Sequence, residues 1–214
     1  MPASKISDNA TRIAKAQLRS KALIQLSTFE APVVLETHGG MGHLYADCYT
    51  HIPRGIVCEK NPEKAQKLLK QRGQKWAVFE CDVEKALRAG LGNHLDVNFL
   101  DVDPYGDPWP TIDGFLQSDR RLPDYLMIVV NDGLRALAQR QRGWTSKTLE
   151  PIVRKYGNTD LFNRWLEICR EMLQERAEHA GYKMQTWAGY YPQRNDYPSH
   201  HMSHYCGLLV KRKA

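Results

Sequence analysis

The sequence of 214 residues predicts an α/β protein built on a seven-stranded, mostly parallel sheet, with helices on both faces and an antiparallel last strand. Two observations lead to this fold class. Short, continuous apolar runs recur along the chain without the alternation of a half-exposed strand, which is typical of strands buried on both faces of a parallel sheet. Helical segments separate most of these runs, which is the rhythm of repeated strand–helix–strand units.

The predicted elements begin with a helix over about residues 10–28, for which Ser7, Asp8 and Asn9 offer N-caps. Pro32 then breaks the chain before the first of five apolar runs, which follow at intervals that leave room for connecting helices. We expect these runs to form the parallel strands. They are Val33–Leu35, Gly55–Cys58, Trp76–Phe79, Val97–Leu100 and Tyr125–Val130.

Helix signals lie between and after these runs. Pro62, preceded by Asn61, starts a helix after the second run. One long helix is expected over residues 160–180, because apolar residues recur there at the helical spacing and Gly181 ends the pattern. The sheet is completed by a pair of strand-like stretches, Met184–Tyr190 and Tyr205–Lys211.

The composition fits one globular domain, with 42% apolar and 25% charged residues. We expect a basic N-terminal helix within residues 1–30, packed on the core of a main domain that covers residues 31–214. Neither a membrane-spanning run nor an apolar leader is found, so we expect a cytoplasmic protein that does not enter a membrane. The five cysteines form no C-x-x-C pair, which favours free thiols over a zinc site or disulfides.

The positive charge is concentrated in two segments. The chain has a net charge of +6, of which residues 1–21 carry +4 and residues 135–155 carry +5, while the remainder is negative. Clustering of this kind favours a polyanionic partner such as a nucleic acid. The alternative is a pair of solvated basic surfaces without a partner.

Acidic residues follow the first four apolar runs: Glu36, Glu59, Asp82, and Asp101 with Asp103. Because the carboxyl ends of parallel strands meet along one edge, where open α/β sheets bind their ligands, we expect these acids to lie together. Any one of them could instead cap a helix N-terminus. Four acids at this spacing favour a ligand site.

A glycine cluster follows the first acid, with His38, Gly40 and Gly42 after Glu36. Glycines allow a ligand to approach the backbone closely. A dinucleotide-binding G-x-G-x-x-G motif would need a third glycine at position 45, where the chain has Tyr45. The pattern therefore does not favour a nicotinamide cofactor.

The acids and the glycine cluster, over residues 31–135, resemble those of class I, Rossmann-like S-adenosylmethionine-dependent methyltransferases. The resemblance implies S-adenosyl-L-methionine as the cofactor. It implies that Glu36 lies near the methionyl amino group, that Glu59 accepts the ribose hydroxyls and that Asp82 accepts the adenine amine. The implied cofactor-binding set is Glu36, His38, Gly40, Gly42, Glu59, Asp82 and Asp101.

The most specific stretch is the D-x-D-P-Y-G-x-P motif over residues 101–108, which resembles the motif of tRNA guanine-N2 dimethyltransferases. An exocyclic amine is a poor nucleophile because its lone pair is delocalised into the ring. Asp103 and the carbonyl of Pro104 can accept its two N–H groups, and Tyr105 can stack on the base. The alternative is that Asp-Pro-Tyr-Gly only forms a turn.

The loop over residues 191–204 is rich in proline, tyrosine and histidine, and we expect it to reach the active edge and clamp a nucleotide. His200, His201 and His204 have no acidic or cysteine partner with clear ligand spacing, so no metal is expected. The sequence thus predicts an N-methyltransferase for an exocyclic nucleobase amine in RNA or DNA. The alternatives are a small-molecule or protein methyltransferase and a non-enzymatic nucleic-acid-binding relative.

Overall fold

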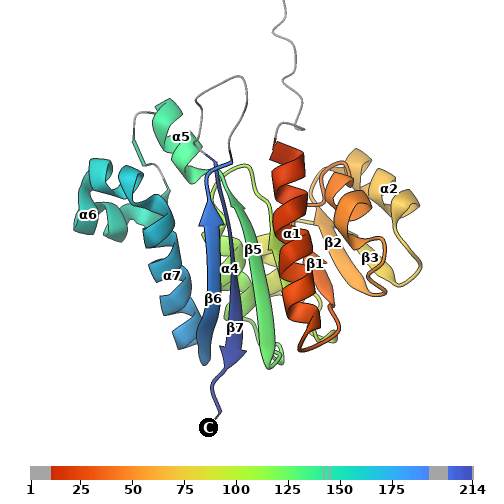
Figure 1. Ribbon diagram of the computed structural model, residues 1–214. Helices are drawn as coiled ribbons and strands as arrows, with labels where there is room; N and C mark the ends of the chain where they lie inside the picture. Colours follow the sequence, from red (N-terminus) through yellow and green to blue (C-terminus); the bar gives the residue numbers. More distant parts are fainter. Residues whose placement is uncertain (1–10, 142, 145, 193–201, 214) are drawn as a thin grey trace, which may run out of the picture.

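The computed structural model describes residues 11–141, 143–144, 146–192 and 202–213, which contain one sheet of seven strands in the order β3-β2-β1-β4-β5-β7-β6. The strands β1 to β5 are parallel, and β7 runs antiparallel to both β5 and β6. The predicted fold class is therefore confirmed (Figure 1). The strands are β1 Val34–Glu36, β2 Gly55–Glu59, β3 Trp76–Glu80, β4 Phe99–Val102, β5 Tyr125–Asp132, β6 Tyr182–Tyr190 and β7 Ser203–Lys211.

Helices cover both faces of the sheet. The α-helices are α1 Arg12–Ser27, α2 Pro62–Gln71, α3 Val83–Arg88, α4 Trp109–Leu116, α5 Leu134–Gln141, α6 Glu150–Asn163 and α7 Trp165–His179. A π-helical turn, η2, covers Tyr45–Tyr49, and a 3₁₀ turn, η3, covers Lys147–Leu149. None of the helices in the described residues is long and apolar enough to cross a bilayer.

Two apolar cores hold these layers together. On one face, α1 and η2 bury side chains such as Leu23, Leu26 and Tyr49 against the sheet, and Figure 1 shows α1 lying across it. On the other face, α3, α4 and α7 bury a larger set that includes Trp109 and Trp165. Each large apolar side chain buried in this way contributes about 1.5–3 kcal/mol, so the sheet is a rigid base for its carboxyl edge.

The single helix expected over residues 160–180 is wrong, because the chain changes direction at Arg164. Its φ of −103° and ψ of 18° separate α6 from α7. Trp165 is fully buried, and its indole nitrogen donates to Asp132 Oδ2 at 3.0 Å, which fixes the start of α7 on the sheet. In α6, only Leu161 is fully buried. The apolar spacing continues across the break, so it did not reveal the change of axis.

The fourth strand begins two residues later than its apolar run. Asn98 precedes it and accepts the Val33 backbone N–H through Oδ1 at 2.8 Å, so this side chain takes the place of a regular ladder bond. The strand also ends later than its apolar run, at Val102, so Asp101 lies within β4, paired in register with Glu36. Asp103 is then the first acid that lies outside the strand.

Candidate active site at the carboxyl edge of the sheet

The glycine-rich turn after β1 is held by the acid that ends β2. Gly40 and Gly42 have φ values of 54° and 80°, in the left-handed region that favours glycine. Glu59 Oε2 accepts the Gly40 N–H at 2.8 Å, and Oε1 accepts the Asn61 N–H at 2.9 Å. Each carboxylate oxygen has a second lone pair, so Glu59 keeps acceptor capacity for a ligand beside the turn.

His38, in the same turn, is half-buried, and its Nδ1 lies 2.8 Å from Thr37 Oγ1. Burial lowers the pKa of His38, so its imidazole is neutral at pH 7. The next residue, Gly39, packs so closely that a Cβ there would lie 2.4 Å from Val57 Cγ2. Gly39 therefore allows the turn that carries His38 to pack directly against β2.

Glu36 at the end of β1 is only 1% exposed and pairs with Arg72, which follows α2. The guanidinium of Arg72 also lies over the ring of Tyr45, 3.8 Å from its centroid. Burial raises the pKa of Glu36 to about 8 despite this cation. One carboxylate oxygen, Oε1, has no partner in the structure, so Glu36 retains one buried acceptor at the edge of the sheet.

Asp101 is fully buried and forms an internal ion pair. Its carboxylate accepts Arg19 Nε at 2.8 Å and the Tyr49 hydroxyl at 2.6 Å. Both Arg19 and Asp101 have side chains with no exposed surface. These contacts tie α1 and η2 to β4, which gives Asp101 a role in the packing of the edge.

Asp82 lies at the start of α3. Its side chain accepts the Lys85 backbone N–H at 3.4 Å as an N-cap and pairs with Lys60 at 3.0 Å. The hydrogen bond from Lys60 lowers the pKa of Asp82. Asp82 thus has the helix-capping role that the sequence left open as an alternative, and it remains partly exposed at the same edge of the sheet.

The loop over residues 103–108 is fixed against the end of β5. Gly133 N donates to Gly106 O at 3.2 Å, and a Cβ on Gly133 would lie 2.7 Å from the carbonyl oxygen of Tyr105. Asp107 accepts the Trp109 N–H at 2.9 Å and the hydroxyl of Ser146. The loop is therefore more than a local turn, because Gly133 binds its backbone and Ser146 binds the Asp107 side chain.

The residues of this loop that the sequence selected as catalytic lie at the carboxyl edge. Tyr105 is 76% exposed, and Pro104 is half-buried between it and Asp103. Lys15 Nζ lies 2.9 Å and 3.0 Å from the two carboxylate oxygens of Asp103. Burial raises the pKa of Asp103, but Lys15 and Arg19 outweigh it, and the pKa falls below its ordinary value. Asp103 is thus held ionised next to an exposed aromatic ring.

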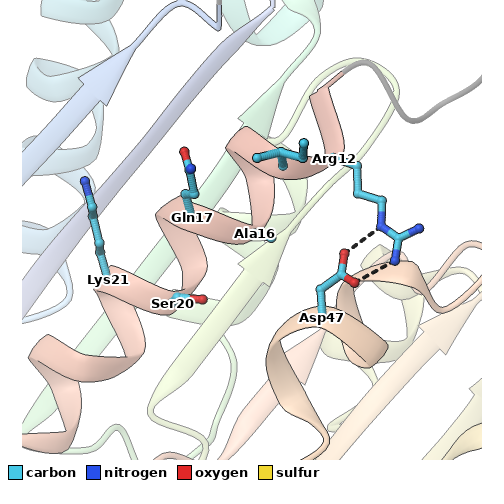
Figure 2. Close-up of a pocket in the computed structure, with 7 residues that line it drawn as sticks. Arg12, Ala16, Gln17, Ser20, Lys21 and Asp47 are labelled. Atoms are coloured by element: carbon cyan, nitrogen blue, oxygen red, sulfur yellow. Dashed lines mark hydrogen bonds and ion pairs between the residues drawn. The ribbon is translucent and has the colours of Figure 1, made fainter.

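A basic stripe on α1 meets a row of carboxylates. Arg12, Lys15 and Arg19 lie three and four residues apart, on one helix face, and pair with Asp47, Asp103 and Asp101 in turn. Figure 2 shows the outermost pair, Arg12 with Asp47, at a hollow between α1 and η2.

The stripe changes the interpretation of the N-terminal charge. Three of the five basic residues in segment 1–21 are occupied by internal ion pairs, so their charges stabilise the position of the helix on the sheet. Lys21, on the same helix, is exposed and points away from Asp47 in Figure 2. The spacing of residues 12, 15 and 19 is the sequence signal that could have revealed this role.

The second basic segment lies on α5, η3 and α6. Arg140 belongs to α5 and is exposed there, whereas Arg142 lies outside the described residues. Arg135 stacks between two rings, 4.0 Å from the centroid of Phe162 and 4.4 Å from that of Tyr191. Arg135 is therefore a structural cation, and the exposed charges of this segment lie farther along.

The expected nucleotide clamp and the histidine cluster fall mainly on residues 193–201, which lie outside the described residues. Within the described residues, no group of three histidine, cysteine, aspartate or glutamate side chains could hold a metal ion. His204 is fully buried on β7, with Nδ1 3.4 Å from the Tyr190 hydroxyl. Burial lowers the pKa of His204 to about 3.

Comparisons with solved structures agree with this architecture. The chain is similar to Trm1 from Pyrococcus horikoshii in complex with S-adenosyl-L-methionine, with a TM-score of 0.65 and 14% identity over 99% of this chain and 58% of that one. It is also similar to the plantazolicin methyltransferase BpumL bound to a desmethyl analogue and S-adenosylhomocysteine, with a TM-score of 0.60 and 12% identity over 96% of this chain and 87% of that one.

A third similar structure is the N-methyltransferase NodS from Bradyrhizobium japonicum with S-adenosyl-L-homocysteine, with a TM-score of 0.58 and 13% identity over 98% of this chain and 92% of that one. No family model and no curated protein matches the sequence. At these identities the similarity establishes the fold, which is that of the class I S-adenosylmethionine-dependent methyltransferases. This chain spans about three-fifths of the length of Trm1.

Proposed function

We propose that this chain is an S-adenosylmethionine-dependent N-methyltransferase that acts on an exocyclic amine of a nucleobase in RNA or DNA. The observation that carries the proposal is the position of Asp103. It lies on the first loop beyond β4, held ionised by Lys15, two residues before the exposed Tyr105. A carboxylate acceptor next to a stacking ring is the combination that a flat base with an amino group requires.

The residues around the glycine turn fit the proposed cofactor. A Cβ on Gly40 would meet no atom within 4 Å, so the turn has open space above its backbone. The buried oxygen Glu36 Oε1 has no hydrogen-bond partner in the structure and can accept a hydrogen bond from an ammonium group. Glu59 has lone pairs left to accept hydrogen bonds from ribose hydroxyls. When bound, the cofactor supplies a methyl group already activated on a sulfonium.

The chain's own residues then prepare the nucleophile. Asp103 accepts one N–H of the substrate amine, and the carbonyl of Pro104 accepts the other, which favours a pyramidal nitrogen with a usable lone pair. Tyr105 stacks on the base and orients this nitrogen. With the cofactor bound, its activated methyl group would pass to the nitrogen lone pair, and Asp103 would take up the proton that the amine loses and release it to solvent. No strong base is needed, because the product nitrogen is acidic until it loses this proton.

A small-molecule or protein substrate is the second candidate, and the similarity to BpumL and NodS is the observation that favours it. Salt dependence separates the two. If the segment 135–155 contacts phosphates, nucleic-acid affinity should fall steeply with salt. Replacing Arg140, Arg142 and Lys147 together should flatten the log–log slope by about two to three, at about 0.7–0.9 per phosphate contact. Salt-insensitive or undetectable binding to RNA and DNA would favour the second candidate.

Calorimetry with S-adenosylmethionine and S-adenosylhomocysteine tests the cofactor directly. We expect both to bind the wild type, and Glu59→Ala to weaken binding by about 1–3 kcal/mol, since one charge-assisted contact is lost. The matched control is Glu63→Ala, which removes an exposed glutamate four residues later on α2 and should leave binding unchanged. Absence of binding to the folded wild type would contradict the proposal.

A further inference from the structure

A hollow lies between the end of α5 and α6, apart from the residues described above as the candidate active site. Its volume is about 280 Å³. Two aromatic rings, Trp144 and Phe162, line it together with the carboxamides of Asn158 and Asn163. In Figure 1, α5 and α6 both lie near the edge of the sheet where the parallel strands end. The hollow, which these two helices line, therefore lies toward the edge of the sheet that carries Asp103.

We propose that this hollow is a second nucleobase subsite, which holds a base flanking the one that is methylated. This inference rests on the proposed function and adds the requirement for a polynucleotide substrate. Aromatic faces stack on any base, and carboxamides pair with base edges, as asparagine does with adenine. The volume lies just below the usual range for ligand pockets, about 300–1,000 Å³, which suits one flat heterocycle.

The aromatic wall of the hollow is fixed by the core beneath it. The ring of Trp144 lies against the buried ring of Trp165, with centroids 4.6 Å apart. The ring of Phe162 lies under the guanidinium of Arg135, which also donates through Nε to the Phe162 carbonyl at 3.0 Å. Rings that are ordered before a base arrives lose little entropy on binding, so this wall is suited to stacking.

The same segment is joined to the catalytic loop. The hydroxyl of Ser146, two residues after Trp144, donates to Asp107 in the loop over residues 103–108. On α5, Leu137 lies next to Ala138, which lines the hollow, and a Cβ on Gly106 would lie 3.2 Å from Leu137 Cδ1. The segment that lines the hollow is therefore attached at two points to the loop that carries Asp103, as two sites for neighbouring nucleotides require.

The charge around the hollow favours a base attached to phosphates over an apolar or neutral ligand. The elements that line or adjoin it carry exposed cations, Arg140 on α5, Lys147 on η3 and Arg154 on α6. The segment 135–155 has a net charge of +5. Phosphodiester groups on either side of the bound base would meet these side chains, which a peptide or small apolar substrate does not require.

Photocrosslinking locates the contact directly. The probe is a short single-stranded RNA of random sequence that carries 4-thiouridine, mixed with wild-type protein and S-adenosylhomocysteine and then irradiated. We expect mass spectrometry to find crosslinked peptides within residues 138–163, at Trp144 or Phe162. Crosslinks confined to other parts of the chain would overturn the subsite.

Binding titrations with the same RNA, without the thio label, give the second measurement. Trp144→Leu should raise the Kd by about fivefold or more, and Trp144→Phe should restore most of the affinity, because stacking is worth about 1–3 kcal/mol per base. Asn158→Ala, at an exposed position of the hollow, tests the carboxamide without disturbing the core. The control is Phe29→Leu, which removes a partly exposed ring that stacks on Tyr125, away from the hollow.

The outcomes separate the subsite from the proposed function. If RNA and DNA do not bind at all while S-adenosylmethionine does, the nucleic-acid substrate is wrong and the subsite with it. If RNA binds and folded Trp144→Leu and Asn158→Ala lose no more affinity than Phe29→Leu, only the subsite is wrong. Unchanged affinity for S-adenosylmethionine and an unchanged Tm identify variants that are folded.

Discussion

The Lys15–Asp103 ion pair allows a sharp test of how α1 supports the site. Lys15→Met removes the ammonium and keeps most of the apolar stem. The two side chains are 15% and 14% exposed, so this ion pair is intermediate between an exposed pair and a buried one. An exposed pair contributes at most about 1 kcal/mol, and breaking a buried pair costs about 3–5 kcal/mol. We therefore expect a loss of about 2 kcal/mol, which lowers the Tm by roughly 4–8 °C for a chain of this size.

A double-mutant cycle isolates the pair from other effects of the substitution. Lys15→Met, Asp103→Asn and the double variant are compared by chemical denaturation, and the coupling energy should be about 1–2 kcal/mol. The internal control is Arg12→Met with Asp47→Asn, a pair on the same face of α1 whose side chains are 34% and 26% exposed. Its coupling should be below about 1 kcal/mol.

The pH dependence of the cycle has a defined sign. Lys15 lowers the pKa of Asp103 in the folded protein, so the ion pair stabilises the fold above the ordinary carboxyl pKa, and this stabilisation is lost as the pH falls below it. The difference between wild type and Lys15→Met should therefore shrink in acid. A coupling no larger than that of Arg12 with Asp47, or one that grows in acid, would refute this account of α1.

Substitutions at Asp103, Tyr105, Gly133 and Asp132 test the site and its support. Asp103→Ala should abolish methyl transfer and leave the Kd for S-adenosylmethionine unchanged. Equal losses of turnover and of cofactor affinity would place the residue in the wrong site. In turnover assays, Tyr105→Phe should lower the rate less than Tyr105→Ala does. Gly133→Ala should lower turnover with a small change in Tm, because the new Cβ would lie 2.7 Å from Tyr105 O and must shift the loop, and wild-type turnover would contradict this. Burial raises the pKa of Asp132 to about 7, so the stability of the wild type should fall by roughly 2–3 kcal/mol as the pH rises from 5 to 7. Chemical denaturation at each pH measures this fall, and Asp132→Asn should remove it.

The fold could be predicted from the sequence because its strands are buried on both faces. The apolar runs at Gly55–Cys58 and Trp76–Phe79 become β2 and β3 with only their last residue missed. The observed strand boundaries differ from the predicted ones where a side chain takes the place of a backbone hydrogen bond, as Asn98 does before β4. The break between α6 and α7 depends on a long-range bond from Trp165 to Asp132, and no local pattern carries that information.

The site was less predictable, since spacing shows that acids share an edge but not what each of them contacts. Glu36 and Asp101 face buried cations, Arg72 and Arg19, that lie 36 and 82 residues away in the sequence. Asp82 caps α3, a role that local sequence already allowed. Lys15 was counted as one basic charge among several, because its partner Asp103 lies 88 residues away.

The most direct test of the proposed activity is methyl transfer from isotope-labelled S-adenosylmethionine to nucleic acid. Purified wild-type protein and Asp103→Ala are incubated with RNA and DNA taken from cells that lack the gene, and the nucleosides are analysed by mass spectrometry. We predict label on an exocyclic nitrogen with the wild type and none with Asp103→Ala. Label on a ring nitrogen or ribose oxygen, or none from a wild type that binds the cofactor, would contradict the proposal.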